Sequence, residues 1–105
     1  MSLLDRDIKT TNVLIDSSWR AKLCDFSFAI HVDSTVKSDY IYGTDEFMAP
    51  EIAMGESFDT QADMFSFGVL LAEVIAEREP NEQFLKRTAR DFFAMDVDQL
   101  RQAVL

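Results

Sequence analysis

The sequence predicts a single α+β domain that is mainly α-helical. Three observations support this class: a length of 105 residues, one long apolar stretch over residues 60–77, and two short β-branched or apolar runs at 13–15 and 21–24. A chain of this length corresponds to one domain. With 48% hydrophobic and 28% charged residues, its composition is that of a globular protein rather than a disordered one.

The first predicted element is a β-hairpin. Residues 13–15 and 21–24 form its two strands, and Asp16-Ser17-Ser18 supplies the polar turn between them. Residues 25–48 then lack any sustained periodicity. A loop of this length inside a compact domain is usually functional.

The strongest predicted helix covers residues 60–77 and is apolar on nearly all sides, so it belongs in the middle of a domain. Thr60 and Asp63 form a capping-box-like pair at its start, and Pro80 disfavours helix at the residue before it. A shorter amphipathic helix is predicted over about residues 96–105. The apolar positions at helical spacing in the long helix are Met64, Phe67, Leu71, Val74 and Ile75.

Charge and cysteine content exclude several classes of protein. The chain carries 10 Lys and Arg against 19 Asp and Glu, which argues against binding to nucleic acid or to an anionic membrane, because phosphates would be repelled. Cys24 is the only cysteine, so an internal disulfide framework and a cysteine-based zinc site are excluded. The single thiol, with no visible signal peptide or membrane-spanning stretch, predicts a cytoplasmic location.

Five short motifs occur in one order along the chain. Residues 6–12 read R-D-I-K-T-T-N, residues 25–27 read D-F-S, residues 43–47 read G-T-D-E-F, residues 48–51 read M-A-P-E, and residues 63–68 read D-M-F-S-F-G. A single three-residue match arises by chance about once in 10⁴ windows, so the ordered set is not a coincidence. In these motifs the sequence resembles the protein kinase family, from its catalytic loop through its activation segment.

The resemblance covers nearly the whole chain and implies a partial kinase large lobe. It places a catalytic loop at 5–12, an activation segment at 25–51 and the central buried helix at 60–77. Lys9, two residues after Asp7, and Gly43-Thr44 are typical of the Ser/Thr type, within the tyrosine-kinase-like group. The implied activity is transfer of the γ-phosphate of ATP, with Mg²⁺, to a Ser or Thr hydroxyl of a protein substrate.

The resemblance also implies a role for each site residue. Asp7 accepts or orients the proton of the substrate hydroxyl, and Lys9 contacts the transferred phosphate. Asn12 and Asp25 hold Mg²⁺ and, with Lys9, bind the nucleotide. The supporting residues are Thr44 beside Asp7, Arg6 for a phosphate on the activation segment, Asp63 as acceptor of backbone N–H groups near Asp5 and Arg6, and Glu51 as partner of an arginine. The candidate phosphate acceptors are Ser34, Thr35, Ser38, Tyr40 and Tyr42.

Three departures from the family pattern bear on activity. Asp5 stands where the family normally has His, and an ionised Asp cannot donate the hydrogen bond that this His makes to the backbone beside the D-F-G aspartate. Ser27 replaces the Gly of D-F-G, which reduces backbone freedom at positive φ. The 105 residues contain no G-x-G-x-x-G loop, no V-A-I-K lysine and no family-type arginine partner for Glu51; Arg87, Arg90 or Arg101 could substitute for that arginine, but nothing in the sequence shows that they do.

Two main hypotheses remain open at this point. The first is a fragment of a Ser/Thr protein kinase that lacks the ATP-binding small lobe and is inactive alone. The alternative is a pseudokinase-like module that binds a regulatory protein partner without catalysis. Asp5 and Ser27 favour the alternative, whereas the retained set of Asp7, Lys9, Asn12 and Asp25 favours the first. A third alternative is a reading frame whose product does not fold alone.

Overall fold

The structure is a computed structural model, and it describes residues 2–32, 44–81 and 83–104. The candidate acceptors Ser34, Thr35, Ser38, Tyr40 and Tyr42 lie outside the described residues. The strands are β1 (Ser2–Leu4), β2 (Val13–Ile15), β3 (Ala21–Leu23) and β4 (Ile30–Val32), and the helices are α1 (Pro50–Ala53), α2 (Gln61–Ala76) and α3 (Val97–Val104). Short 3₁₀ helices occur at Thr10–Asn12, Asp45–Phe47 and Ala89–Asp91.

The described strands form two separate antiparallel pairs. β2 pairs with β3, with Val13 opposite Leu23, so the predicted hairpin is present. β1 pairs with β4, with Leu4 opposite Ile30. The prediction of a continuous loop from residue 25 to 48 was therefore wrong at β4, because residues 30–32 find a partner strand at the start of the chain.

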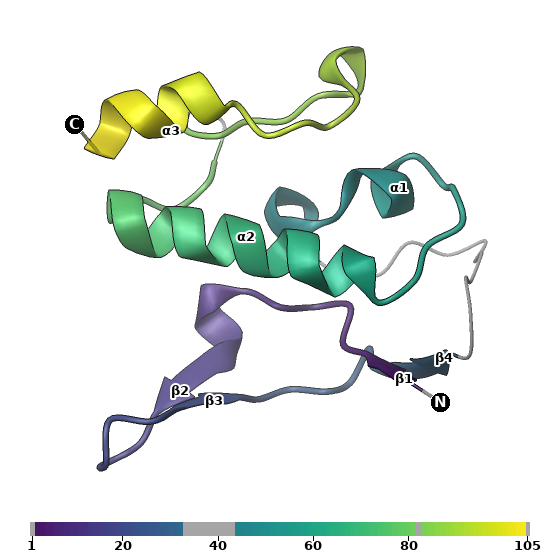
Figure 1. The fold of residues 1–105 in the computed structure, drawn as a ribbon, viewed down its shortest axis with the longest axis vertical. Coiled ribbons are helices and arrows are strands. Elements are labelled where there is room, and N and C mark those ends of the chain that lie inside the picture. The colour runs from purple at the N-terminus through teal and green to yellow at the C-terminus, as the bar shows by residue number, and fades with distance from the viewer. Residues whose placement is uncertain (1, 33–43, 82, 105) are drawn as a thin grey trace.

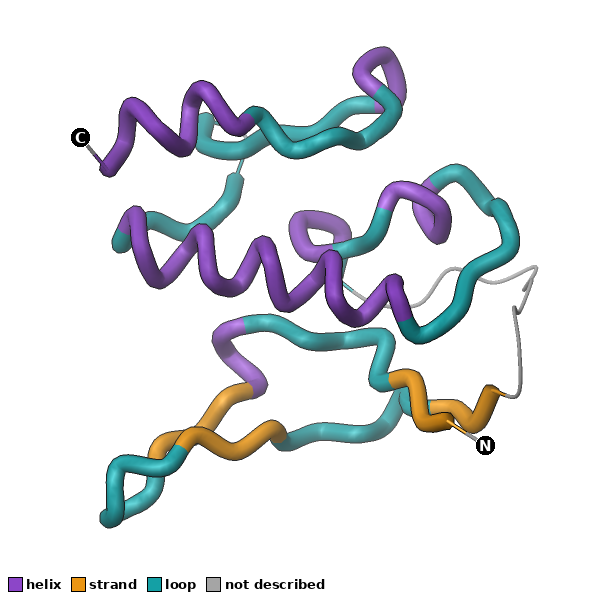
Figure 2. Tube along the Cα trace, in the orientation of Figure 1, coloured by secondary structure: helices purple, strands orange, loops and turns teal. Residues whose placement is uncertain are grey.

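Helix α2 runs through the middle of the molecule (Figure 1). All four described strands lie on one side of it, and α1 and α3 lie on the other, as the colouring by secondary structure makes clear (Figure 2). Small antiparallel pairs and separate helices place the chain in the α+β class. Among the described residues, no helix combines the length and the hydrophobicity needed to cross a membrane.

The molecule is flat, with extents of 43 × 41 × 17 Å. Because a helix with its side chains is about 10–12 Å across, a layer this thin leaves part of α2 uncovered. Val69 and Leu70 are buried, with exposed fractions of 1% and 9%. The prediction of a helix buried on nearly all sides was wrong, because the apolar positions chosen by periodicity are 43–62% exposed: Met64, Phe67, Leu71, Val74 and Ile75.

The apolar core consists of three small clusters arranged along α2. The first joins α2 to β1 and α1, the second joins it to the loop of residues 5–12, and the third joins it to the segment before α3. In that order, their buried members are Leu4, Met48, Ala49, Ile52, Phe58 and Ala62; Ile8, Phe47, Val69 and Leu70; and Ala72, Phe84 and Leu85. Helix α2 therefore supports β1, α1, the loop of residues 5–12 and the segment before α3.

Both ends of α2 lie one residue inside the predicted bounds. The side chain of Thr60 makes no capping hydrogen bond, so the predicted capping box was wrong. The helix ends where Glu77 adopts a left-handed conformation, with φ of 55°. Helix α3 is capped by Asp96, whose Oδ1 accepts the N–H of Gln99 at 3.0 Å.

Candidate active site

Asp7 is a buried carboxylate in the segment of residues 5–12, hereafter the 5–12 loop, which connects β1 to β2 (Figure 1). Thr44 Oγ1 donates to Asp7 Oδ1 at 2.9 Å, and Asn12 Nδ2 donates to Asp7 Oδ2 at 3.1 Å. The same Asn12 Nδ2 donates to the backbone oxygen of Asp7 at 3.0 Å. Both carboxylate oxygens of Asp7 are held by hydrogen bonds, and the direction of the side chain is fixed.

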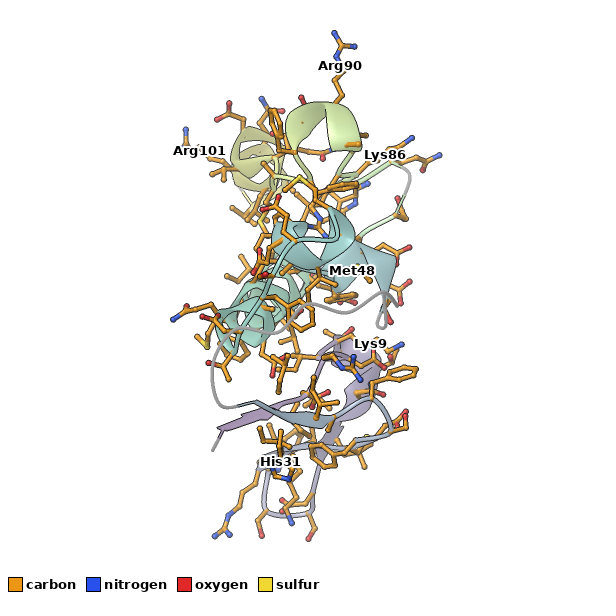
Figure 3. All side chains as sticks on the ribbon, turned by 90° about the vertical axis from the view of Figure 1, so that its right-hand side faces the viewer. Lys9, His31, Met48, Lys86, Arg90 and Arg101 are labelled. Carbon is orange, nitrogen blue, oxygen red and sulfur yellow. The ribbon has the colours of Figure 1, made fainter. Side chains whose placement is uncertain are left out.

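Lys9 lies beside the same carboxylate. Its Nζ donates to Thr44 Oγ1 at 2.8 Å and is 3.8 Å from Asp7 Oδ1. The side chain of Lys9 is 26% exposed and that of Asp7 is 7% exposed, so the ammonium group is the more open of the two. Figure 3 shows Lys9 between the strands that include His31 and the segment that contains Met48. Thr44, which is distant in the sequence, therefore connects the charged groups of Asp7 and Lys9 by hydrogen bonds.

Polar residues of α2 hold both segments in place. Asp63 Oδ2 accepts the N–H of Asp5 at 2.7 Å, and its Oδ1 accepts the N–H of Arg6 at 3.1 Å. Glu73 Oε2 accepts from Thr10 Oγ1 at 2.7 Å, and Ser66 Oγ donates to the backbone oxygen of Phe47 at 2.7 Å, close to Thr44. The resemblance assigned this position to Asp63. It gave no role to Ser66, which belongs to the D-M-F-S-F-G motif, or to Glu73, whose only sequence signal is a polar residue inside an apolar run.

Asp25 is exposed and lies two residues beyond the end of β3. Because the N–H of Cys24 donates to the backbone oxygen of Asn12 at 2.8 Å, Asn12 and Asp25 flank the same end of the hairpin. Ser27 donates to Asp25 Oδ1 from its hydroxyl at 2.6 Å and from its N–H at 3.2 Å. These two bonds, the hydroxyl first, and the positive charge of Lys9 lower the pKa of Asp25 below its ordinary 3.8. The positive φ of this segment, 62°, is at Asp25 and not at Ser27.

Asp5 is buried at the start of the 5–12 loop. Its Oδ1 accepts the N–H of Asp7 at 3.1 Å. Burial raises the pKa of Asp5 above its ordinary 3.8; the N–H of Asp7 opposes the rise, and the negative charges of Asp63, Asp7 and Asp25 add to it. Four acidic residues, Asp5, Asp7, Asp25 and Asp63, therefore lie near one another at the site.

Arg6 and Glu51 differ in the side-chain interactions that they make with other described residues. Arg6 Nε donates to the backbone oxygen of Phe28 at 2.6 Å, within the segment for which the resemblance implies a phosphate. Glu51 is half-buried, and in the described ranges no ion pair joins it to an arginine. The three arginines that could substitute lie elsewhere: Arg87 donates to the backbone oxygens of Met48 and Phe93, Arg90 points away from the molecule (Figure 3), and Arg101 lies 3.7 Å from Asp98.

Asn12 and Asp25 offer oxygen atoms suited to Mg²⁺. Since Asn12 Nδ2 is occupied by Asp7, the carbonyl oxygen Oδ1 is the atom that remains for a ligand. Mg²⁺ prefers oxygen and is usually held by one or two protein groups together with phosphates and water. These two residues fit that pattern, and the part of the chain that the structure describes has no cluster of three or more His, Cys, Asp or Glu residues suited to a metal ion.

The chain belongs to the protein kinase family, since the family model for the protein kinase domain matches residues 1–104. It is 40% identical over 102 residues to the RasGEF domain-containing serine/threonine-protein kinase X of Dictyostelium discoideum, covering 95% of this chain and 11% of that protein. From the same organism, probable serine/threonine-protein kinase kinX is 45% identical over 80 residues (75% of this chain, 7% of that protein), and probable serine/threonine-protein kinase kinY is 38% identical over 108 residues (97% and 18%). The chain spans less than a fifth of each of these relatives.

Proposed function

We propose that this chain is part of the catalytic domain of a protein serine/threonine kinase, which transfers the γ-phosphoryl group of ATP to a Ser or Thr hydroxyl of a protein substrate. The observation that carries the proposal is the hydrogen-bonded set of Asp7, Lys9, Asn12 and Thr44. Relatives that are named serine/threonine-protein kinases support the class of acceptor.

Asp7 acts on the substrate hydroxyl. Each of its carboxylate oxygens has more than one acceptor position, so a lone pair remains after the bonds from Thr44 and Asn12. Asp7 accepts the hydroxyl proton as the hydroxyl oxygen bonds to the γ-phosphorus and the bond from that phosphorus to the ADP oxygen breaks. Because both oxygens are held before substrate arrives, no reorientation is needed at that moment.

Lys9 stabilises the negative charge that develops on the transferred group. Thr44 lies between the two charged side chains: it donates to Asp7 and accepts from Lys9, while the Lys9 Nζ to Asp7 Oδ1 distance stays at 3.8 Å. Lys9 is therefore not committed to a close ion pair with Asp7, and its charge remains available for a phosphate.

Asn12 and Asp25 hold the divalent ion in this proposal. Mg²⁺, when bound, neutralises charge on the ATP phosphates. Asp25 is ionised at neutral pH, and its lowered pKa extends the charged, cation-binding form to more acidic pH. Asp7 keeps Asn12 Oδ1 free by accepting from its amide nitrogen.

A chimeric kinase tests the proposal. Residues 2–104 replace the matching region of the Dictyostelium RasGEF domain-containing kinase, and transfer of labelled γ-phosphate from ATP to a Ser/Thr peptide is measured. We expect the chimera to be active, and Asp7→Asn to lower kcat by about 10² or more. The 105-residue chain alone, which has no glycine-rich loop in its sequence, is expected to transfer no phosphate.

Asp98→Asn is the matched control, because Asp98 is 87% exposed in α3 and the substitution makes the same change of charge. It is expected to leave kcat unchanged. A folded chimera that binds Mg²⁺ and ATP but transfers no phosphate would contradict the proposal and favour a pseudokinase-like interaction module, for which Asp5 and Ser27 are the sequence arguments.

A further inference from the structure

Asp5 is placed to act on the backbone of Asp7. Its side chain is buried, with an exposed fraction of 7%, and its Oδ1 accepts the N–H of Asp7 at 3.1 Å. Its own N–H donates to Asp63 Oδ2 at 2.7 Å. Asp5 therefore connects α2 to Asp7: α2 fixes the backbone of Asp5, and the side chain of Asp5 fixes the backbone of Asp7 two residues later.

The surroundings of Asp5 make a carboxylate there costly. The charged groups that face it are Asp7 from its own loop, Asp63 from α2 and Asp25 from the segment after β3. The guanidinium of Arg6 donates to the backbone oxygen of Phe28. Burying an anion among three other acids is unfavourable. The charge-assisted hydrogen bond that the Asp5 carboxylate accepts from the N–H of Asp7 partly offsets this cost.

We propose that Asp5 is a positioning residue for Asp7, and that its ionised carboxylate sets the backbone conformation from which the Asp7 side chain reaches Thr44 and Asn12. The inference rests on the proposed function, because it assigns Asp5 to the same reaction. The family pattern has a hydrogen-bond donor at this position, whereas Asp5 is an acceptor. In this chain the side chain of Asp5 accepts a hydrogen bond instead of donating one, and the donor is the N–H of Asp7 itself.

The position has a consequence for the dependence of activity on pH. Burial and the three neighbouring acids raise the pKa of Asp5. Protonation of Asp5 turns a charge-assisted bond into a neutral one, which is about half as strong. As the pH falls through the pKa of Asp5, the geometry of Asp7 loosens, and kcat declines at a higher pH than an ordinary Asp would set.

The first test is a pH titration of the 105-residue chain by NMR, repeated on the chimera. The side-chain carboxyl carbon of Asp5 and the amide proton of Asp7 are followed together. We expect both signals to change with one midpoint, which lies above 3.8, the ordinary pKa of an Asp side chain. In Asp5→Asn the carboxamide oxygen still accepts the N–H, and the Asp7 amide is expected to lose that titration step.

The second test is kinetic and uses the chimera. Asp5→Ala removes the acceptor, and we expect kcat to fall about ten- to hundredfold with little change in KM for ATP, because misplacement of a reacting group by about 1 Å costs on that order. Asp5→Asn is expected to lower kcat less and to move the acid limb of the kcat profile to lower pH. Asp98→Asn is the control and is expected to leave the limb in place.

The outcomes separate this inference from the proposed function. A shared Asp5 and Asp7 midpoint in an inactive chimera keeps the structural link and overturns the assignment to phosphoryl transfer. An active chimera whose acid limb and Asp7 amide are unchanged in Asp5→Asn overturns the positioning role alone. If Asp5→Ala does not fold, the near-isosteric Asp5→Asn and the titration of the unmodified chain still decide between these outcomes.

Discussion

Two neighbouring regions supply the candidate site, and they differ sharply in how they are held. The 5–12 loop contributes Asp7, Lys9 and Asn12, and most of its site groups are buried against α2. Residues 13–31, which form the hairpin, the D-F-S segment and part of β4, include no buried residue at all. Asp7 accepts hydrogen bonds from Thr44 and Asn12, whereas among the described residues Asp25 accepts hydrogen bonds only from its neighbour Ser27.

The difference follows from the polar residues of α2. Asp63 and Glu73 make hydrogen bonds to the 5–12 loop, and no hydrogen bond is recorded between α2 and residues 13–31 in the described ranges. The part of the site proposed to accept the proton is therefore preformed, which is the arrangement that favours catalysis by fixed charges. Of the two residues proposed to hold the metal ion, Asn12 is held by hydrogen bonds to Asp7, whereas Asp25 lies on an exposed segment.

Removing the support from α2 is expected to have the largest effect. Asp63→Ala leaves the N–H groups of Asp5 and Arg6 without their acceptor, and the free energy of unfolding of the 105-residue chain is expected to fall by about 2–5 kcal/mol. Urea unfolding measures this change. Loss of the Asp63 charge also lowers the pKa of Asp5 toward its ordinary value, which NMR titration of Asp5 checks.

Asp63→Asn is the matched variant, because its single oxygen keeps an acceptor for one of the two N–H groups. Its free energy of unfolding is expected to lie between those of the wild type and Asp63→Ala. Equal stability of all three proteins would contradict a supporting role for α2 and would remove the physical basis of the comparison.

Substitution of two isoleucines compares how firmly the 5–12 loop and the hairpin are packed. Ile8 in the 5–12 loop is 9% exposed, and Ile15 in β2 is 58% exposed. Ile8→Ala is expected to cost about 2–4 kcal/mol of unfolding free energy through lost burial and a cavity, and Ile15→Ala less than about 1 kcal/mol. Similar costs in urea unfolding would show that the hairpin is as firmly packed as the loop.

The sequence predicted elements that depend on local signals. The hairpin followed from two short runs separated by turn residues, and both strands are present with the turn at Asp16 between them. The bounds of α2 were also predicted to within one residue, because the apolar stretch is long and Pro80 limits it. The family resemblance supplied the position of Asp63, which no periodicity would have given.

The buried face of α2 was not predictable from its pattern. A helix that is apolar nearly all round gives no strong choice of face, and the buried side is the one with small residues, including Ala62, Ser66 and Ala72, that let other segments approach closely. The β1–β4 pairing was missed for a different reason. Each strand has three residues and they are far apart in the sequence, so no local signal connects them.

The smallest expected effect concerns Asp25, and it isolates what a single hydroxyl contributes on the exposed side of the site. Ser27→Ala removes the 2.6 Å hydroxyl bond and keeps the backbone N–H bond, so the pKa of Asp25 is expected to rise toward 3.8. Because a lowered pKa means that the unfolded chain binds more protons in the acid range, the wild type loses stability as the pH falls through the pKa of Asp25. The Ser27→Ala variant should lose less stability than the wild type over the same fall in pH.

The hairpin turn offers a matched control for this variant, because it repeats the same D-x-S pattern. Asp16 accepts the N–H groups of Arg20 and Ser18, and these backbone bonds, with Lys22, lower the pKa of Asp16 without a contribution from the Ser18 hydroxyl. Carbon-detected titration of both aspartates should therefore show a shift at Asp25 in Ser27→Ala and none at Asp16 in Ser18→Ala. No shift at Asp25 in Ser27→Ala would mean that the Ser27 hydroxyl does not lower the pKa of Asp25, and that the backbone N–H of Ser27 and the charge of Lys9 account for the lowered pKa.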